Sequence, residues 1–543
     1  MLQTDILIIG GGAAGLRASI EARRRGSEVV LASKAPMGYS SSTLYSGGGF
    51  RAAFGGYSKE RHFEETIIGG KLLNDQELVR TMALEAPDRL AELKEFGVTV
   101  KPREGGISVS DGPLTPGKGL VSPMTDYAKA LGVAFLENVA AIDLMVDDSA
   151  HGAVFYDSRN DRVFPILSKA TILATGGYSQ LFARTDNPVR VSGDGCAMAL
   201  RAGATLIDLE FTQFFPIGLA EEGKPAWLFP ALSGRLVNSL DEDILTKYRF
   251  NKPLSRAAVE DRDMLSRAMW TEIFEGRGTK EALIIDLSRT TNEDYLSNLA
   301  GIASFLSRSL DMKSPKIKVA PTAHFTMGGV KIEVNCETSI PGLFACGEVS
   351  SGVHGANRLG GNALTETIVF GARAGGRAAE WAETNEHGAL DESYVDGAER
   401  LISNFKKGKY SIEEMRGGLK RETWAKCGVI RDKERLTELL DYIVENRAVA
   451  DEARATTSSD VMKAMELRNM FELAEAVASS ALTREESRGA HYRLDFPKQR
   501  DDLWLKRIAV NKTDDKLSFS LLPVELKYFS TTGSDSYSGV LSD

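Results

Sequence analysis

The stretch that decides the fold is DILIIGGGAAGLRASIEARRRGSEVVLASK, residues 5–34. It reads as an apolar strand, a glycine turn, a helix and a second apolar strand. Gly10, Gly12 and Gly15 form the pattern GxGxxG where the first strand meets the helix. In a dinucleotide fold these glycines permit the tight turn, the approach of a pyrophosphate and the close packing of helix on strand. The stretch therefore predicts an α/β, Rossmann-like domain that binds a nucleotide.

The second strand ends at Ser33 and Lys34, where many dinucleotide sites carry Asp or Glu for the ribose. A serine still hydrogen-bonds a hydroxyl, so the sequence leaves the choice of nucleotide open at this point. Next comes MGYSSSTLYSGGGF, residues 37–50, a second small-residue loop that is too polar for a core. Such a loop can lie against a flat ring system or more phosphate, and two glycine-rich loops favour FAD over NAD. The alternative is a flexible surface linker.

Three later segments extend the same domain. ATILATGG, residues 170–177, is a buried strand that runs into a glycine turn, and SGDG, residues 192–195, places Asp194 before a helix. LFACGEV, residues 343–349, is another apolar strand, and its Glu348 can supply the ribose acceptor from a distant part of the chain. The nucleotide domain is therefore expected to be discontinuous, with an insertion between about residues 220 and 340.

Composition excludes several classes of function. The 543 residues are too many for one core, and a net charge of -9 with interspersed signs does not favour a nucleic-acid partner. The four cysteines form no CxxC pair, so we expect buried thiols and no metal cluster. No apolar run reaches the roughly 18–20 residues of a membrane span, and the N-terminus enters a strand at once. A cytoplasmic protein without direct membrane insertion is the expectation.

Further strings spread over nearly the whole chain carry a family resemblance. They are KATILATGGYSQLFARTDNP (169–188), SGDGCAMALRAGATLIDLEFTQFFP (192–216), DRDMLSRAMWTEIFEGRG (261–278), PTAHFTMGGV (321–330), PGLFACGEVSSGVHGANRLGGNAL (341–364) and ESRGAHYRLDFPKQRDDLWLK (486–506). With the opening glycine motif, they resemble the flavoprotein subunit of the succinate dehydrogenase and fumarate reductase family, which includes L-aspartate oxidase.

The resemblance implies a Rossmann-like FAD-binding domain interrupted by an α+β capping domain and followed by a helical domain. We place the FAD-binding domain at 1–219 and 341–395, the capping domain at 220–340 and the helical domain at 396–500. Apolar residues at helical spacing in 435–446 and 461–482 agree with the last of these. Within the remaining segment, 501–543, residues 517–528 read as a proline-interrupted edge strand, and the tail is poor in large apolar residues.

The chemistry implied by the resemblance is hydride transfer between flavin N5 and a carbon next to a carboxylate. The first arginine of the RDxxSRA string, Arg262, matches the family's proton donor. His324 and Arg358 match the residues that hold the substrate carboxylate, which a planar guanidinium and an imidazole can polarise and orient. His354 and His491 are assigned to structure and domain packing. We expect no metal ligands.

The residues expected to contact FAD come from both glycine loops and from the later segments. They are Gly10, Gly12, Ala13, Ala14, Gly15, Ser33, Lys34, Ser41, Ser42, Thr43, Gly47, Gly48, Gly49, Ala174, Thr175, Gly176, Asp194, Glu348, Asn362, Ala363 and Leu364.

The chain departs from the family pattern at three places. Members with covalent flavin carry a histidine in an SHT string, which here reads Ser41-Ser42-Thr43, so FAD is expected to be non-covalent and its potential lower. The family's QFHPTGL appears as QFFPIGL, with Phe215 and Ile217 replacing histidine and threonine. The TEAxRGEGG string, which supplies a threonine and a relay glutamate, is replaced by WLFPALSGRLVN, residues 227–238. A second substrate carboxylate would then lack a partner unless Arg235 or another residue approaches it.

The function that the resemblance implies is an FAD-dependent oxidoreductase acting on a CH–CH group, with fumarate or a related unsaturated carboxylate as its substrate. L-Aspartate oxidase, or a reductase or dehydrogenase of another carboxylate or acyl substrate, is an alternative. A flavin-bearing electron-transfer subunit without a small substrate of its own is another. Nothing in the chain relays single electrons, so free reduced flavin, a dithiol route or an iron-sulfur protein subunit must supply them. The resemblance favours the iron-sulfur subunit.

Overall fold

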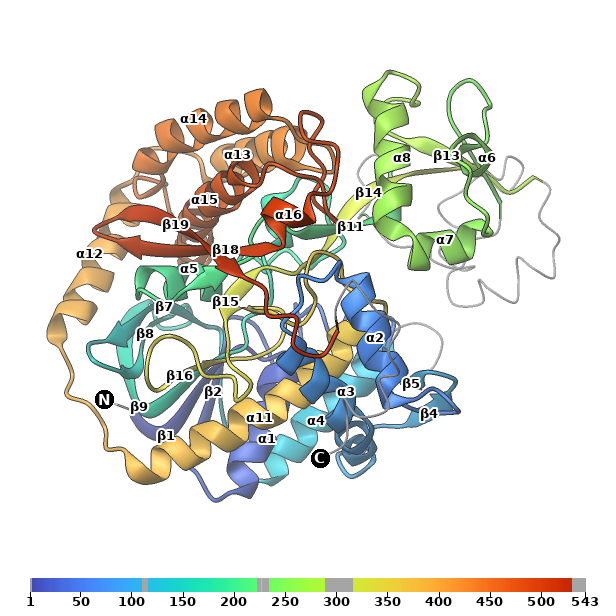
Figure 1. Cartoon of the computed structure of the whole chain (residues 1–543). Helices are drawn as coiled ribbons and strands as arrows, with labels where there is room; N and C mark the ends of the chain where they lie inside the picture. Colours follow the sequence, from blue (N-terminus) through green and yellow to red (C-terminus); the bar gives the residue numbers. More distant parts are fainter. Residues whose placement is uncertain (1, 110–115, 222–225, 227–233, 289–315, 530–543) are drawn as a thin grey trace.

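A seven-stranded sheet forms the centre of the computed structural model, which describes residues 2–109, 116–221, 226, 234–288 and 316–529 (Figure 1). Its strand order is β6-β2-β1-β9-β8-β7, and β16 also pairs with β9. Strands β1, β2, β6, β9 and β16 pair in parallel, whereas β7 and β8 add an antiparallel meander. The strand bounds are β1 (Leu2–Ile9), β2 (Val29–Ser33), β6 (Ala134–Glu137), β7 (Val139–Val146), β8 (Ala150–Asp157), β9 (Arg162–Leu173) and β16 (Leu343–Ala345).

Helices α1 (Ala13–Arg24) and α11 (Asn362–Thr384) lie side by side beneath this sheet, although about 350 residues separate them in the chain (Figure 1). Their backbones approach so closely that a Cβ at Gly375 would lie 2.3 Å from the carbonyl oxygen of Ala18. Only glycine fits at this contact. The second part of the nucleotide domain is thus packed directly on the first. Three further helices belong to this layer or border it, namely α2 (Lys59–Gly69), α3 (Gln76–Ala91) and α4 (Pro116–Ala130).

A small three-stranded sheet, ordered β3-β5-β4, lies beside α2 and α4. It consists of β3 (Gly49–Arg51), β4 (Val100–Arg103) and β5 (Gly106–Val109). The strand β3 follows the second glycine loop directly, so this sheet fixes the end of that loop. Two short 3₁₀ helices, η1 (Glu92–Lys94) and η2 (Ser179–Leu181), and helix α5 (Asp194–Arg201) complete the first part of the chain.

A separate four-stranded sheet, ordered β11-β14-β13-β12, carries the predicted α+β insertion (Figure 1). Strands β11 (Thr212–Leu219) and β14 (Lys316–Thr326) lead out of the main body into it and pair antiparallel. The other elements are β12 (Arg235–Val237), β13 (Leu283–Asp286), α6 (Ile244–Lys247), α7 (Leu254–Glu260) and α8 (Arg262–Phe274). They enclose an apolar core of their own. The connecting strands extend into the neighbouring predicted domain, and the boundary residues stay predictions.

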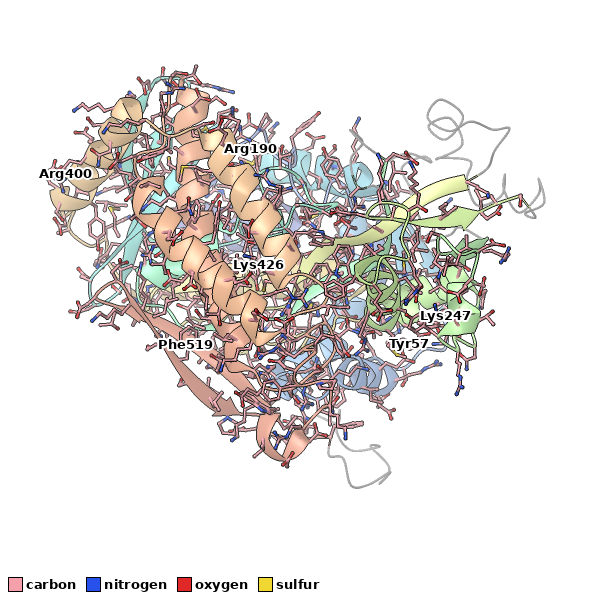
Figure 2. All side chains as sticks on the ribbon, turned by 90° about the horizontal axis from the view of Figure 1, so that it is seen from above. Tyr57, Arg190, Lys247, Arg400, Lys426 and Phe519 are labelled. Carbon is pink, nitrogen blue, oxygen red and sulfur yellow. The ribbon has the colours of Figure 1, made fainter. Side chains whose placement is uncertain are left out.

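The predicted helical region lies on the other side of the main body (Figure 2). Its helices are α12 (Glu392–Lys407), α13 (Ile412–Cys427), α14 (Lys433–Ala450) and α15 (Ser458–Thr483). Helix α15 starts with a capping box, in which Thr457 and Asp460 satisfy each other's backbone N–H groups. The chain then returns through α16 (Asp501–Trp504) to β18 (Lys506–Thr513) and β19 (Lys516–Pro523).

Strands β18 and β19 join a five-stranded sheet ordered β17-β15-β10-β18-β19. The other members are β10 (Leu206–Ile207), β15 (Gly329–Lys331) and β17 (Ser350–Ser351). The strand expected at 517–528 is thus present as β19 but ends at Pro523. The expected tail, residues 530–543, lies outside the described residues. Within the described part of the chain, no helix is both long and apolar enough to cross a membrane.

Candidate active site

A cavity of about 1140 Å³ runs from the first glycine turn to the insertion. Its volume exceeds the roughly 300–1,000 Å³ of most small-molecule pockets, as a dinucleotide requires. Segments separated by more than 300 residues meet on its wall. The predicted site residues that line it are Gly10, Gly12, Ala13, Ala14, Ser33, Lys34, Ser41, Ser42, Thr43, Gly47, Gly48, Gly49, Ala174, Thr175, Gly176, Asp194, Arg262, His324, Glu348, Arg358, Ala363 and Leu364.

The first glycine turn has the shape that a pyrophosphate needs. Gly10 has a φ of +123°, and a Cβ there would lie 2.2 Å from the carbonyl oxygen of Ala174, so glycine is required. Helix α1 begins after Gly12, which has no side chain to cap the first turn, and such a helix end attracts anions. Thr43 from the second glycine loop accepts a hydrogen bond from the N–H of Ala13 at 3.2 Å. The two glycine loops therefore face one cavity, and their residues fit FAD.

Two predicted FAD-contacting residues are not on the cavity wall. A Cβ at Gly15 would lie 1.9 Å from the carbonyl oxygen of Gly10, so this glycine acts behind the wall by letting helix and turn pack. The Asn362 side chain points away, with Oδ1 2.9 Å from His62 Nε2 and Nδ2 donating to Thr66 Oγ1. Asn362 therefore fastens the start of α11 to α2, whereas its neighbours Ala363 and Leu364 line the cavity.

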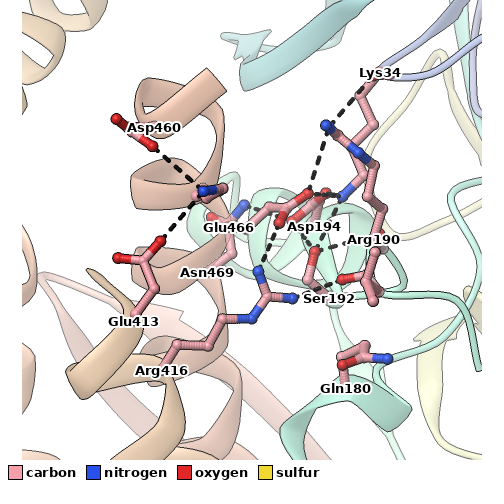
Figure 3. A network of polar contacts seen from close by, with 12 residues as sticks. Lys34, Gln180, Arg190, Ser192, Asp194, Glu413, Arg416, Asp460, Glu466 and Asn469 are labelled. Carbon is pink, nitrogen blue, oxygen red and sulfur yellow. Dashed lines mark hydrogen bonds and ion pairs between the residues drawn. The ribbon is translucent and has the colours of Figure 1, made fainter. Parts of the chain in front are cut away.

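Lys34 and Asp194 line the cavity, but their charges are bound to each other (Figure 3). Lys34 Nζ lies 2.5 Å from Asp194 Oδ2 and 2.8 Å from Glu466 Oε1 of α15. Asn469 Nδ2 donates to Asp194 Oδ1 at 3.0 Å, and Arg416 Nη1 lies 3.0 Å from Glu466 Oε2. These contacts join the nucleotide domain to the helical region. No sequence signal pointed to Glu466, since it lies within a helix whose pattern indicated only packing.

Arg262 is the first residue of α8, and its guanidinium is held by neutral oxygen atoms. Its Nη1 donates to Gln213 Oε1 at 2.9 Å and its Nε to the carbonyl of Val259 at 3.2 Å. Gln213 Nε2 in turn donates to Asn357 Oδ1 and to the carbonyl of Arg358. Gln213, which precedes the FFP part of its string, thus connects the two arginines. Burial and the charge of Arg358 lower the pKa of Arg262 to about 9.

Arg358 presents its guanidinium over the Phe325 ring, with Cζ 4.5 Å from the ring centroid. Its buried Nε has no hydrogen-bond partner in the described part of the chain. Burial lowers its pKa to about 10. His354, which was assigned to structure, packs edge-on against Phe325 and pairs with buried Glu366 at 2.8 Å. It therefore supports the surface on which Arg358 lies.

His324 faces the cavity near the end of β14, and its Nδ1 lies 2.8 Å from Asp186 Oδ2. Burial, the largest influence, lowers the pKa of His324, although the Asp186 carboxylate opposes that shift. The Phe215 ring also lies beside His324, with the two ring centroids 5.5 Å apart. Asp186 lies in the quoted string ARTDNP, yet nothing in the sequence linked it to a histidine 138 residues away.

Glu348 lies on the same wall, next to the strand that carries His324. Its Oε1 accepts hydrogen bonds from the backbone N–H of Thr326 at 3.0 Å and from the Thr326 hydroxyl at 3.3 Å. Burial raises the pKa of Glu348 to about 7. The structure therefore brings the predicted ribose acceptor to the cavity but gives one of its oxygens a protein partner.

These residues make one end of the cavity suitable for an anion. Arg262 and Arg358 have no carboxylate partner in the described part of the chain, and buried cations without partners are costly. An anionic ligand would relieve that cost. In the same described ranges, no group of three or more His, Cys, Asp or Glu side chains is arranged to hold a metal ion. All four cysteines are free and buried, as expected.

Two family models together match most of the chain. A model described as FAD binding domain matches residues 5–364, and one described as Fumarate reductase flavoprotein C-term matches residues 416–537.

Similar proteins match over nearly their full lengths. A fumarate reductase (CoM/CoB) subunit of Methanothermobacter marburgensis is 35% identical over 541 residues, which cover 94% of this chain and 98% of that protein. An uncharacterized FAD-dependent oxidoreductase of Methanocaldococcus jannaschii is 38% identical over 96% of this chain and 99% of its own. A solved structure of a mutated quinol fumarate reductase FrdA of E. coli has a TM-score of 0.88 at 29% identity, with 99% of both chains covered.

Proposed function

The chain belongs to the fumarate reductase flavoprotein family of FAD-dependent oxidoreductases that act on a CH–CH group, and from this premise we propose that it reduces fumarate or a related unsaturated carboxylate. One observation carries the proposal. Arg262, His324 and Arg358 converge on the cavity that also holds the two glycine loops. Two arginines and a histidine beside a flavin site suit a substrate whose carboxylate must be fixed and polarised.

Each of the three residues has a distinct proposed task. Arg358 and His324 bind the carboxylate next to the double bond, which draws electron density from that bond. When bound, FAD supplies the hydride for one carbon. Arg262 holds the proton for the neighbouring carbon at its guanidinium. An arginine gives up a proton only with difficulty, and the burial that lowers the pKa of Arg262 to about 9 favours this task.

We propose that FAD is held without a covalent bond. Ser42, which stands where covalent members carry histidine, donates through Oγ to Asn187 Oδ1 at 2.9 Å. A serine hydroxyl cannot form the histidyl bond. Acid precipitation of the purified protein should therefore release all yellow colour into the supernatant. Colour that stays in the washed pellet would contradict the non-covalent assignment without affecting the proposed reaction.

An iron-sulfur protein subunit is the proposed electron partner. Two relatives bear the words flavoprotein subunit in their names, and no metal cluster site is present among the described residues. A dithiol route and free reduced flavin are alternative electron sources. The isolated chain should bind FAD and show no turnover with NADH. Sustained NADH oxidation by this chain alone would contradict the need for a partner.

The reaction is tested anaerobically with the purified FAD-loaded chain. Its flavin is reduced chemically, fumarate is added, and the flavin absorbance band is followed. Rapid reoxidation is expected, with succinate as the product. If fumarate leaves the reduced flavin unchanged, a panel of unsaturated monocarboxylates and acyl thioesters follows, because Phe215 lines the cavity in place of a polar residue. Failure of every acid to reoxidise or perturb the flavin would support an electron-transfer subunit without a small substrate.

A further inference from the structure

The Asp186–His324 pair is a feature of the cavity that the proposed reaction leaves unexplained. We propose that Asp186 is a positioning residue that makes His324 take up one proton whenever a carboxylate binds beside it. Substrate binding is then coupled to proton uptake. This inference rests on the proposed function in one respect, namely that the substrate carboxylate lies at His324.

The chemistry of a single imidazole between two carboxylates requires the extra proton. Nδ1 of His324 lies 2.8 Å from Asp186 Oδ2, so Nδ1 must carry hydrogen to bond it. In a neutral ring the other nitrogen, Nε2, then presents a lone pair. A substrate carboxylate would meet that lone pair with its own oxygens. Adding one proton from solvent turns Nε2 into a donor and gives an imidazolium between two anions. The opposite neutral tautomer only moves the same conflict to Asp186.

The backbone around Asp186 holds the pair in place. Asn187 Nδ2 donates to the carbonyl of His324 at 2.8 Å and to Asp186 Oδ1 at 3.1 Å. Thr185 Oγ1 donates to the carbonyl of Ala323 at 2.9 Å. Residues 185–187 are thus hydrogen-bonded to the backbone of β14 at Ala323 and at His324. These hydrogen bonds hold the backbone beside Asp186 and also one oxygen of its carboxylate, so that the other oxygen is directed at His324.

The other groups around His324 keep its ring neutral until the substrate binds, so the proton is taken up together with the substrate. Arg262 and Arg358 oppose protonation of His324 through their positive charge, and burial opposes it more strongly. Phe215 contributes an apolar ring. The Glu348 carboxylate accepts a hydrogen bond from Thr326, two residues after His324 on β14, and not from the histidine ring. Asp186 is thus the carboxylate in contact with the ring within the described residues. A bound substrate carboxylate adds the second negative charge and shifts the balance towards imidazolium.

Malonate is a suitable probe for this coupling because it has carboxylates but no CH–CH pair to dehydrogenate. It is titrated into the oxidised, FAD-loaded chain between pH 6 and 8.5, with flavin absorbance as the signal. Calorimetry in phosphate and in Tris at pH 7.5 then counts protons from the difference in buffer ionisation heat. We expect close to one proton taken up per malonate bound. The affinity should fall by up to about tenfold per pH unit above the pKa of free His324.

The informative variant is Asp186→Asn, which keeps the shape of the side chain and removes its charge. Its proton uptake should fall to near zero and the slope of affinity against pH should flatten, while FAD content is unchanged. Asp186→Glu should restore part of both. The matched control is Asp147→Asn, because Asp147 also bonds a histidine, His151, at 2.6 Å but lies outside the cavity. It should behave as the wild type.

Three outcomes separate this inference from the proposed function. Malonate binding by the wild type without proton uptake would overturn the coupling and leave the carboxylate site intact. An Asp186→Asn protein that keeps the full proton uptake per malonate and the full slope of affinity against pH would also overturn the coupling. The proton would then belong to another group. If no carboxylate binds to the wild type at all, the proposed function fails, and the inference fails with it. If Asp186→Asn does not fold, the proton uptake of the wild type and the pH dependence of malonate affinity in Asp186→Glu still test the coupling.

Discussion

The aromatic ring of Phe215 lies against the imidazole of His324, with the ring centroids 5.5 Å apart and the planes inclined at 58°. The Arg262 guanidinium carbon lies 5.6 Å from the centroid of the same phenyl ring. Phe215 therefore lies beside two of the three proposed substrate-contacting residues, and its ring can neither donate nor accept an ordinary hydrogen bond. The relationship follows from β11 and β14 pairing, which sets Phe215 opposite Thr322, two residues before His324.

Phe215→His should improve the use of fumarate. A charge-assisted hydrogen bond contributes about 1.5–3 kcal/mol, so kcat/KM for fumarate should rise roughly 10- to 100-fold where the imidazole meets the second carboxylate. Steady-state rates with fumarate and with crotonate, a monocarboxylate, measure the difference. Phe215→Leu is the control, because it removes the ring without adding a donor. An equal gain for both substrates, or a gain in the leucine variant, would contradict this role.

Arg262→Ala and Arg358→Ala should each abolish most turnover while the protein stays yellow. General acid catalysis contributes typically 10²- to 10⁴-fold, so a loss in that range is expected for Arg262→Ala, chiefly in kcat. Arg358→Ala should act more on KM because it binds the carboxylate. Anaerobic flavin reoxidation at varied fumarate concentration gives the limiting rate and the half-saturating concentration, the single-turnover counterparts of kcat and KM. Arg400→Ala, on the exposed face of α12 (Figure 2), is the control and should leave the rates unchanged. Unaltered rates in both cavity variants would place the active site elsewhere.

Glu466→Gln should lower stability and weaken FAD binding together. Glu466 is buried and bonds Lys34 and Arg416 between the nucleotide domain and the helical region. Removing one member of a buried ion pair costs about 3–5 kcal/mol, and because Lys34 is partly exposed, we expect a loss of about 3 kcal/mol. Urea unfolding and FAD titration provide the measurements.

Glu413→Gln is the matched control for that variant. Glu413 bonds Lys463 at 3.2 Å in the same region, but its side chain is 71% exposed. Exposed pairs contribute about 0–1 kcal/mol, so little change is expected. Equal effects of the two substitutions would show that burial does not decide the contribution of this network.

Asp208→Asn should change how stability depends on pH. Burial raises the pKa of Asp208 to about 7 from its usual 3.8, and neither carboxylate oxygen has a hydrogen-bond partner among the described residues. Between these two values the folded state holds the proton more firmly, so stability falls as pH rises from about 4 to about 7. Asparagine resembles the protonated form and also accepts the positive φ of 61° at this position.

Urea unfolding at pH 5 and pH 8 tests this expectation. The stability advantage of Asp208→Asn over the wild type should be small at pH 5 and larger at pH 8, because the wild type loses stability over this range. Asp241→Asn is the control, since Asp241 has a φ of 59° but is exposed. A parallel pH profile for the Asp208→Asn protein and the wild type would show that Asp208 does not titrate in this range.

The features predicted correctly from sequence are those encoded within short stretches. The GxGxxG turn, its strands and its helix lie within 30 contiguous residues, where turn chemistry and apolar periodicity act locally. The strings that resemble the family also predicted the α+β insertion and the helical region. They named Arg262, His324 and Arg358, which the structure places on the cavity wall. Distant Glu348 was expected at the nucleotide site as a replacement for the ribose acceptor that is missing after the second strand.

The side-chain partners could not be read in the same way. Asn362 was expected at FAD but bonds His62 and Thr66, while Lys34 and Asp194 reach the cavity with their charges already paired. Asp186 meets His324 across 138 residues of chain. Sequence by itself thus determined the nucleotide fold and the types of residue at the site. The tertiary structure decided which of them face the cavity and which face each other, because strand register and the packing of distant helices set those directions.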